Sequence, residues 1–326
     1  MFRAIALGAF VLMLRVFSVF VPEQEYRAKV DGIAPMTEKN GGMDLNGWSY
    51  EQVGSSDGSF NHHFYHHPAK TDSAPVFLFI HGLNLDGRTF LNLNGLSSDY
   101  ELIAYDMPEQ CPWYKGDYDD YIRVISDFLE IRDIKRLSLM GVSFGGGIAL
   151  GLAAQRPELK IRNLILASTA ISEQSEVQTE MTQWLSEQPD YIIYWFVEQL
   201  YRRSADNYES SSSEPSVKKL LRIKHPSYYR QISASLGEHN AVHDAADLNR
   251  MPVLLLMGDQ DRLFSVESAQ KTIDYLDNGT LEVIKGGTHS MVYTKAAVIE
   301  QKIRDFIDAG NRQHVSKGNA KAVDTF

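Results

Sequence analysis

The sequence predicts an α/β fold with a mostly parallel central sheet and helices on both of its faces. Short apolar runs of strand length recur along the 326 residues, and segments with helical periodicity separate most of them. Runs without polar alternation are typical of strands that are covered on both faces. The composition, 44% hydrophobic and 23% charged, allows one large domain with an insertion or two smaller domains.

The first expected element is a hairpin that begins near Trp48 and turns at residues 54–58. The remaining strands are expected at residues 75–80, 101–105, 136–140, 163–167, 252–257 and 280–284. Between the second and third of these runs, residues 118–131 carry apolar side chains at helical spacing. We therefore assign residues 46–170 and 249–310 to the sheet domain.

Residues 171–248 interrupt this alternation, because they contain no convincing strand and hold aromatic, helix-like material. We expect a helical insertion that forms a lid over the site. Trp195 and Phe196 are candidates for lining a substrate pocket there, and the alternative is that they pack on the sheet domain. Residues 311–326 are expected to be a frayed polar tail.

The first 21 residues are expected to be a signal peptide or a signal anchor. Arg3 precedes eleven uncharged residues, 4–14, and after Arg15 the apolar run continues to Val21. This run is short for a membrane span and contains a charge, and the alternative is a helix packed on the domain. Residues 22–45 are expected to be a linker. The sequence favours export, periplasmic or extracellular, or membrane attachment through residues 4–21, over a cytoplasmic location.

Charge and cysteine count limit the possible partners. A formal net charge of −10 argues against nucleic acid. The single cysteine, Cys111, cannot form an intramolecular disulfide, and a cysteine-based metal site is improbable. Four histidines fall in the early hairpin, at positions 62, 63, 66 and 67. We expect them on a solvated edge strand, and a metal site is the lesser alternative.

Ser143 has the surroundings that a nucleophilic serine needs. It lies between Gly141 and Gly145, after a predicted strand and before an apolar helix, in the pattern G-x-S-x-G. Side chains at the two glycines would collide with neighbouring backbone in such a tight turn. The start of the helix would place N–H groups near the hydroxyl. The glycine pattern matches neither the phosphate-binding nor the dinucleotide-binding motif.

A serine nucleophile needs a base and a group that orients this base. His289 follows the predicted strand 280–284 and a turn at Gly286-Gly287. Asp259 and Asp261 follow the predicted strand 252–257. In a parallel sheet these positions share the carboxyl edge with Ser143.

Over residues 48–310 the chain resembles the α/β-hydrolase family. The family's order of serine, acid and histidine is matched by Ser143, Asp261 and His289. The stretch Gly258–Asp261 resembles the family's G-x-x-D element, so Asp259 is the second choice for the acid. The stretch His81-Gly82-Leu83 resembles the family's His-Gly element.

The resemblance implies that the backbone N–H groups of Leu83 and Phe144 form an oxyanion hole. One loop departs from the family. Many relatives carry D-x-P-G-x-G-x-S after the second central strand, where this chain reads Asp106-Met107-Pro108-Glu109-Gln110-Cys111. A substrate pocket inferred from better-matched relatives is therefore not transferred. We interpret Cys111 as a small filler and not as a second nucleophile.

The function that the resemblance implies is hydrolysis of carboxylic esters with small to medium acyl chains, through an acyl-enzyme and without a metal or organic cofactor. The expected partner is a small-molecule ester. A peptidase similar to the proline iminopeptidases, or a carbon–carbon bond hydrolase, would use the same residues. A ligand-binding receptor with this fold is the alternative from another class. Relatives that open epoxides or haloalkanes use aspartate at the position of Ser143.

Overall fold

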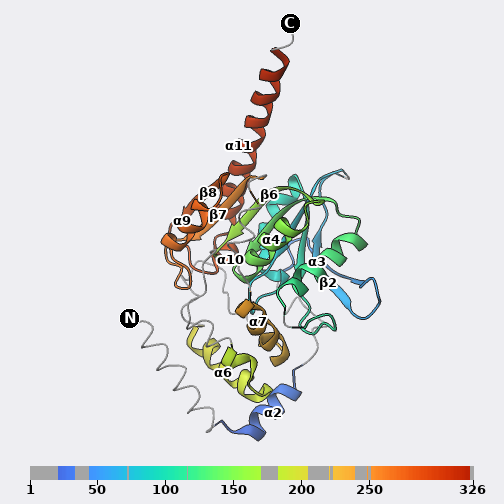
Figure 1. Cartoon of the computed structure of the whole chain (residues 1–326), viewed down its shortest axis with the longest axis vertical. Helices are drawn as coiled ribbons and strands as arrows, with labels where there is room; N and C mark the ends of the chain where they lie inside the picture. Colours follow the sequence, from blue (N-terminus) through green and yellow to red (C-terminus); the bar gives the residue numbers. More distant parts are fainter. Residues whose placement is uncertain are drawn as a thin grey trace.

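The computed structural model describes residues 21–33, 44–71, 73–115, 117–169, 183–204, 220, 223–238, 248 and 251–323. Its centre is an eight-stranded sheet (Figure 1) with the order β1-β2-β4-β3-β5-β6-β7-β8. The strands are β1 (Ser49–Gly54), β2 (Asn61–His67), β3 (Val76–Ile80), β4 (Glu101–Asp106), β5 (Arg136–Val142), β6 (Lys160–Ala167), β7 (Val253–Gly258) and β8 (Gly279–Ile284). Every predicted strand is present within a few residues.

The pairs β1–β2 and β2–β4 are antiparallel. The remaining pairs, β4–β3, β3–β5, β5–β6, β6–β7 and β7–β8, are parallel. The mostly parallel sheet that the sequence predicts is thus confirmed. The helical elements of the sheet domain are η1 (Gly87–Ser98), α3 (Asp119–Ile131), α4 (Phe144–Gln155), α9 (Val266–Asp274), α10 (Met291–Thr294) and α11 (Ala296–Val323). Because consecutive parallel strands all end at one edge, their loops gather there.

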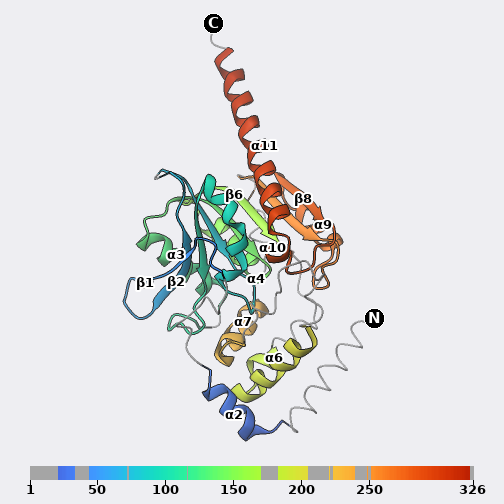
Figure 2. The ribbon, with the colours of Figure 1, turned by 180° about the vertical axis from the view of Figure 1, so that it is seen from behind.

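Successive side chains of the strands point to opposite faces of the sheet and form two separate hydrophobic cores. On one face Leu78, Leu139 and Leu255 pack with residues of α3, α4 and α9. On the other face Phe79 and Met140 pack with residues of η1, α10 and α11. Figure 1 shows α3 and α4 in front of the sheet, and Figure 2 shows α10 and α11 on the reverse side. Both faces of the sheet are therefore covered, as the continuous apolar strands require.

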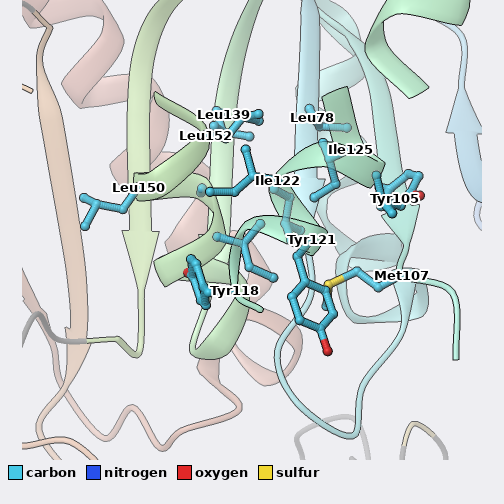
Figure 3. Packing of buried hydrophobic residues seen from close by; sticks show 14 of the residues in the cluster. Leu78, Tyr105, Met107, Tyr118, Tyr121, Ile122, Ile125, Leu139, Leu150 and Leu152 are labelled. Carbon is cyan, nitrogen blue, oxygen red and sulfur yellow. The ribbon is translucent and has the colours of Figure 1, made fainter. Parts of the chain in front are cut away.

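The core beside the site is close-packed. Figure 3 shows Ile122 and Ile125 of α3 directed at Leu78 and Leu139 of the sheet. All four side chains are at least 97% buried. Tyr121 lies at the lower end of this cluster, where the loops that follow the strands begin. The packed layer thus fixes the strand ends from which the site is built.

The insertion contains the helices α6 (Asp190–Ser204) and α7 (Pro226–Glu238), and both lie at the end of the molecule away from α11 (Figure 1). They confirm helical structure within residues 171–248. A further helix, α2 (Glu23–Asp31), packs against α6. The hydroxyl of Tyr26 donates to Glu198 at 2.8 Å, and the ammonium of Lys29 lies 3.3 Å from the same carboxylate.

Helix α2 corrects the expectation of a linker over residues 22–45, because residues 23–31 are helical and docked on the insertion. Residues 1–20, where the signal peptide or anchor is predicted, lie outside the described residues. None of the described helices combines the length and the apolar composition needed to cross a membrane. At the other end, α11 continues to Val323, so helical backbone occupies most of the range expected to be a frayed tail.

The expectation of a solvated edge strand for the four histidines is wrong. β2 lies between β1 and β4, and His62 is fully buried. The Tyr105 hydroxyl lies 2.7 Å from His62 Nδ1, and Asp127 Oδ2 lies 2.9 Å from Nε2. Burial lowers the pKa of His62 despite the neighbouring Asp127 carboxylate. This ring joins the sheet to α3.

Candidate active site

Ser143 occupies a strained turn between β5 and α4. Its φ and ψ angles are 54° and −121°, a backbone conformation that residues other than glycine rarely adopt. A Cβ on Gly141 would stand 2.2 Å from the carbonyl oxygen of Gly145. A Cβ on Gly145 would stand 2.4 Å from the carbonyl oxygens of Ile80 and His81. The two glycines therefore let the start of α4 touch the ends of β3 and β5, as the sequence predicts.

The structure brings Ser143, His289 and Asp261 into one hydrogen-bonded chain. His289 Nε2 lies 3.0 Å from Ser143 Oγ, and His289 Nδ1 lies 2.9 Å from Asp261 Oδ2. Because the carboxylate can only accept, Nδ1–H donates to Asp261, which leaves Nε2 to accept from the serine hydroxyl. Residues separated by 146 and 28 positions thus adopt the geometry that a nucleophile, a base and an orienting acid require.

Both oxygens of Asp261 are engaged. While Oδ2 accepts from His289, Oδ1 accepts from the backbone N–H groups of Leu263 and Phe264 at 2.8 and 3.1 Å. Burial alone would raise the pKa of this fully enclosed carboxyl. The hydrogen bond and charge of His289, with the two backbone donors, outweigh burial and hold the pKa below its ordinary value. Asp261 is therefore ionised at neutral pH.

Phe264 adds a second constraint on the histidine. Its ring stacks on the His289 imidazole with centroids 5.8 Å apart and an interplanar angle of 30°. The same short loop therefore holds His289 at its edge, through Asp261, and at its face, through Phe264. No motif in the sequence marks Phe264, which follows the acid by only three positions.

Asp259, the second choice for the acid, binds the backbone of the histidine loop. Its Oδ1 accepts from the N–H of Gly286 at 2.6 Å, in the turn that leads to His289. Close beside it, a Cβ on Gly258 would stand 2.2 Å from the carbonyl oxygen of Gly287. The loops after β7 and β8 are thus in direct backbone contact, and Asp259 braces the histidine loop from outside.

The loop after β3 runs against the nucleophile turn. A Cβ on Gly82 would stand 3.1 Å from Ser143 Cβ, so this loop passes directly beside the serine. Leu83 follows in this loop, and Phe144 is the first residue of α4. Both predicted oxyanion donors therefore belong to backbone that adjoins Ser143.

His81 locks the loop that carries Leu83. The ring is fully buried, with Nδ1 2.8 Å from the carbonyl oxygen of Gly82 and Nε2 accepting from Met107 N–H at 3.1 Å. Burial, together with the charge of Lys224, lowers the pKa of His81 to about 4. The ring is therefore neutral and ties the ends of β3 and β4 together.

Two aromatic rings at the start of α3 lie beside Phe144. The centroids of the Tyr118 and Tyr121 rings lie 6.1 and 5.3 Å from that of the Phe144 ring, edge to face. Cys111 is 6% exposed, and burial raises the pKa of its thiol to about 11. A thiol of this kind is a poor nucleophile, which agrees with its interpretation as a filler.

The insertion reaches the site region through residues that the sequence analysis did not single out. Arg88, paired with Asp86 at 2.8 Å, donates to the carbonyl oxygen of Leu220 at 3.4 Å. Lys224 is 1% exposed, and its ammonium lies 4.3 Å from the centre of the Tyr228 ring. A single buried lysine leaves no periodic signal in a sequence.

The two predicted pocket residues lie on α6. Phe196 is 4% exposed and packs edge to face against Trp184 of the insertion, with centroids 5.7 Å apart. Trp195 is half-buried and packs against the larger core. Their role in lining a substrate pocket stays a prediction.

Comparison with known proteins places this geometry in a family. The family model described as serine aminopeptidase, S33, matches residues 111–295, which is more than half of the chain. The chain belongs to this α/β-hydrolase family. It is 24% identical over 257 residues to a poly(3-hydroxyalkanoate) depolymerase of Ectopseudomonas oleovorans, covering 76% of this chain and 89% of the relative.

Two further proteins extend the comparison. A monoacylglycerol lipase of Mus musculus, ABHD6, is 22% identical over 271 residues, covering 72% of this α/β-hydrolase and 75% of the lipase. Among solved structures, a bacterial membrane phospholipase A aligns with a TM-score of 0.60 and 21% identity, covering 95% of this chain and 99% of the phospholipase. At these identities the structural match shows the shared fold alone.

Asp261 and Asp259 make different contacts, so their asparagine variants should differ in activity. Asp261→Asn should lower kcat by about 10⁴-fold, because an amide opposite Nδ1 favours the wrong imidazole tautomer. Asp259→Asn is the matched control and should lose far less activity, because Asp259 contacts Gly286 and not His289. Steady-state hydrolysis of an activated ester measures both, and a larger loss in Asp259→Asn would contradict the assignment.

The neutral, buried His81 predicts a pH dependence of stability. Its pKa falls from 6.5 to about 4 on folding, so the unfolded chain takes up the proton first as pH decreases. The contribution of neutral His81 to the free energy of unfolding is fully present above pH 6.5. It is lost as the pH falls toward 4, at about 1.4 kcal/mol per pKa unit. Urea unfolding across this interval should therefore show a shallower pH slope for His81→Asn than for the wild type.

The comparison with the variant isolates His81 from the other histidines. His62, whose pKa burial lowers, acts in the same direction, whereas His66, whose pKa is raised mainly by its hydrogen bond to Glu101, acts in the opposite one. Both are present in the variant and the wild type. Equal slopes in the two proteins would show that His81 is not the group responsible.

Proposed function

We propose that this chain is a serine hydrolase that cleaves carboxylic esters through an acyl-enzyme at Ser143. The observation that carries the proposal is the hydrogen-bonded chain from Ser143 through His289 to Asp261, built on a strained turn. Membership of an α/β-hydrolase family supports it. The fully occupied Asp261 carboxylate supports it further, because a rigid acid keeps the base in one orientation.

In the proposed mechanism, Ser143 Oγ attacks the ester carbonyl carbon while His289 Nε2 takes its proton. Asp261 stabilises the imidazolium that forms. Collapse of the tetrahedral intermediate expels the alcohol, which receives the proton from His289, and leaves an acyl group on Ser143. Water then attacks this acyl group with His289 again as the base. The carboxylic acid departs and the serine hydroxyl is restored.

The oxyanion of each tetrahedral intermediate is assigned to the backbone N–H groups of Leu83 and Phe144. The approach of Gly82 to Ser143 and the start of α4 at Phe144 support this assignment. Preorganised donors of this kind contribute about 10²–10³-fold each to turnover. The neutral His81 keeps the Leu83 loop in place in this scheme.

The proposed substrates are esters with small to medium acyl chains. Apolar residues occur in the loops at the triad: Leu263 is 64% exposed, Leu83 is 37% exposed, and Phe264 stacks on His289. The depolymerase, the lipase and the phospholipase are named for substrates joined by ester bonds. The insertion over residues 171–248 is proposed as the lid, with Trp195 and Phe196 facing the acyl chain.

A panel of substrates tests the bond that is cleaved. p-Nitrophenyl esters with acyl chains of increasing length should be hydrolysed, and Ser143→Ala should remove this activity without changing the circular dichroism spectrum. In Trp195→Ala, discrimination between short and medium chains should fall by several-fold, since each buried methylene contributes about 0.8 kcal/mol. Uniform loss across the panel with a lower Tm would instead assign Trp195 to packing.

The family description favours one second candidate, an aminopeptidase. The same triad would attack an amide, but the site would also have to hold the free N-terminal ammonium of a peptide. Amino-acid p-nitroanilides, including the proline derivative, belong in the same panel. A kcat/KM for an anilide above that of every ester would replace the esterase proposal with the peptidase.

We propose that residues 4–21 direct export or anchor the chain to a membrane. Their apolar composition supports this proposal. Deleting residues 1–21 should move the protein into the soluble fraction with its activity intact. Deleting residues 1–33, which also removes α2, should lower the Tm through loss of the Tyr26 and Lys29 contacts with Glu198.

Fractionation and melting curves of the full chain and both deletions separate the outcomes. Membrane association that survives the shorter deletion would overturn the anchoring proposal. Unfolding caused by the shorter deletion would favour a packed N-terminal helix. An equal Tm for the two deletions would show that α2 adds no stability.

A further inference from the structure

A hollow of about 560 Å³ lies at the end of the sheet opposite Ser143. Val76, Glu101 and Arg136, which line it, are the first residues of β3, β4 and β5, whereas Ser143 follows the last residue of β5. At about 3.3 Å per residue, the seven residues of β5 separate the two regions by roughly 20 Å. The hollow is therefore distinct from the candidate active site.

The lining of this hollow is basic, although the chain as a whole carries a formal charge of −10. Its charged lining residues are Arg132, Lys135, Arg136, Arg162, Glu101 and Asp133. Cations thus outnumber carboxylates by two within a small concave region. Like charges gathered in this way repel one another unless an anion lies between them.

Both carboxylates of the lining are already paired. Glu101 Oε1 lies 3.1 Å from His66 Nε2 and 3.6 Å from an Arg132 nitrogen. Asp133 Oδ1 lies 2.5 Å from the ammonium of Lys135. These contacts neutralise the charge on one side of the hollow.

Two arginines supply the positive charge that is left. Arg136 and Arg162 come from the neighbouring parallel strands β5 and β6 and line the same hollow. Within the part of the chain that the structure describes, neither makes an ion pair. Burial raises the pKa of the nearby Tyr100, and the positive charge of Arg162 offsets part of this rise. The pair therefore presents two guanidinium groups to a ligand.

We propose that this hollow binds a small anion with at least two negative charges, a phosphate monoester or a phosphoanhydride. Guanidinium groups match phosphate oxygens with paired, charge-assisted hydrogen bonds. The volume is that of a small-molecule site. This binding does not depend on the reaction at Ser143.

A soluble phosphate compound fits the position of the hollow better than a lipid headgroup does. Helix α2, through which the N-terminal segment joins the fold, packs on α6 at the end of the molecule where the insertion lies. The hollow lies at the amino ends of the strands, away from that attachment. A membrane reached through the N-terminus would therefore be far from Arg136 and Arg162.

Pyrophosphate is the probe for the full-length chain. A ligand that binds only the folded state raises the Tm, so saturating pyrophosphate should raise it by about 2 °C or more above sodium chloride of equal ionic strength. Titration calorimetry should give one site. Arg136→Gln/Arg162→Gln should lose both signals while ester hydrolysis stays at the wild-type level.

Lys271→Gln/Lys285→Gln is the matched control, because it removes two exposed positive charges outside this hollow. This control should bind pyrophosphate as the wild type does. If the double variant does not fold, the single variants Arg136→Gln and Arg162→Gln replace it. Each should bind pyrophosphate at least several-fold more weakly than the wild type.

Three results would overturn the proposal. The first is a Tm rise no larger than that in sodium chloride. The second is equal pyrophosphate binding by the wild type and Arg136→Gln/Arg162→Gln. The third is binding to phosphatidylglycerol vesicles without binding to pyrophosphate, which would assign the arginines to a lipid surface.

Discussion

Close contact between glycine backbones is the constraint on which the candidate site depends. Gly141 and Gly145 let the turn at Ser143 press against the ends of β3 and β5, where any side chain would stand 2.2–2.4 Å from a carbonyl oxygen. Gly258 and Gly287 make the same kind of contact between the acid loop and the histidine loop. The first contact fixes the turn of Ser143, and the second holds the loops of Asp261 and His289 against each other. The positive φ of Ser143 is maintained by this packing.

Two histidines at the carboxyl ends of the strands have different roles because their buried surroundings differ in charge. Burial keeps His81 neutral although Asp106 Oδ1 lies 3.6 Å from its Nε2, and the ring holds two strand ends together through the Met107 N–H. His289 is hydrogen-bonded to an ionised carboxylate that two backbone N–H groups hold in place. A base in that setting can accept a proton and have the resulting charge stabilised. Phe264 restricts the same ring from its face.

The sequence was sufficient for the strands and for the residues that the structure brings together, because both leave local signals. Uniform apolar runs mark buried strands, and glycines mark the loops at Ser143 and His289. Contacts between distant segments leave no such signal. His62 is buried because β4 pairs with β2, and α2 is ordered beside α6, whose Glu198 lies 172 positions from Tyr26. From their polar composition alone, both β2 and α2 are expected to be exposed to solvent.

The central claim is that Ser143 is the nucleophile, activated by the folded arrangement and not by its sequence alone. Intact-mass and peptide-mass analysis after treatment with a fluorophosphonate tests it most directly. The account predicts a single adduct, on the peptide that contains Ser143, in the native protein. No adduct should form after urea denaturation or in His289→Ala at the same reagent concentration and time. An adduct on another serine, or equal labelling of the native and denatured chains, would contradict the account.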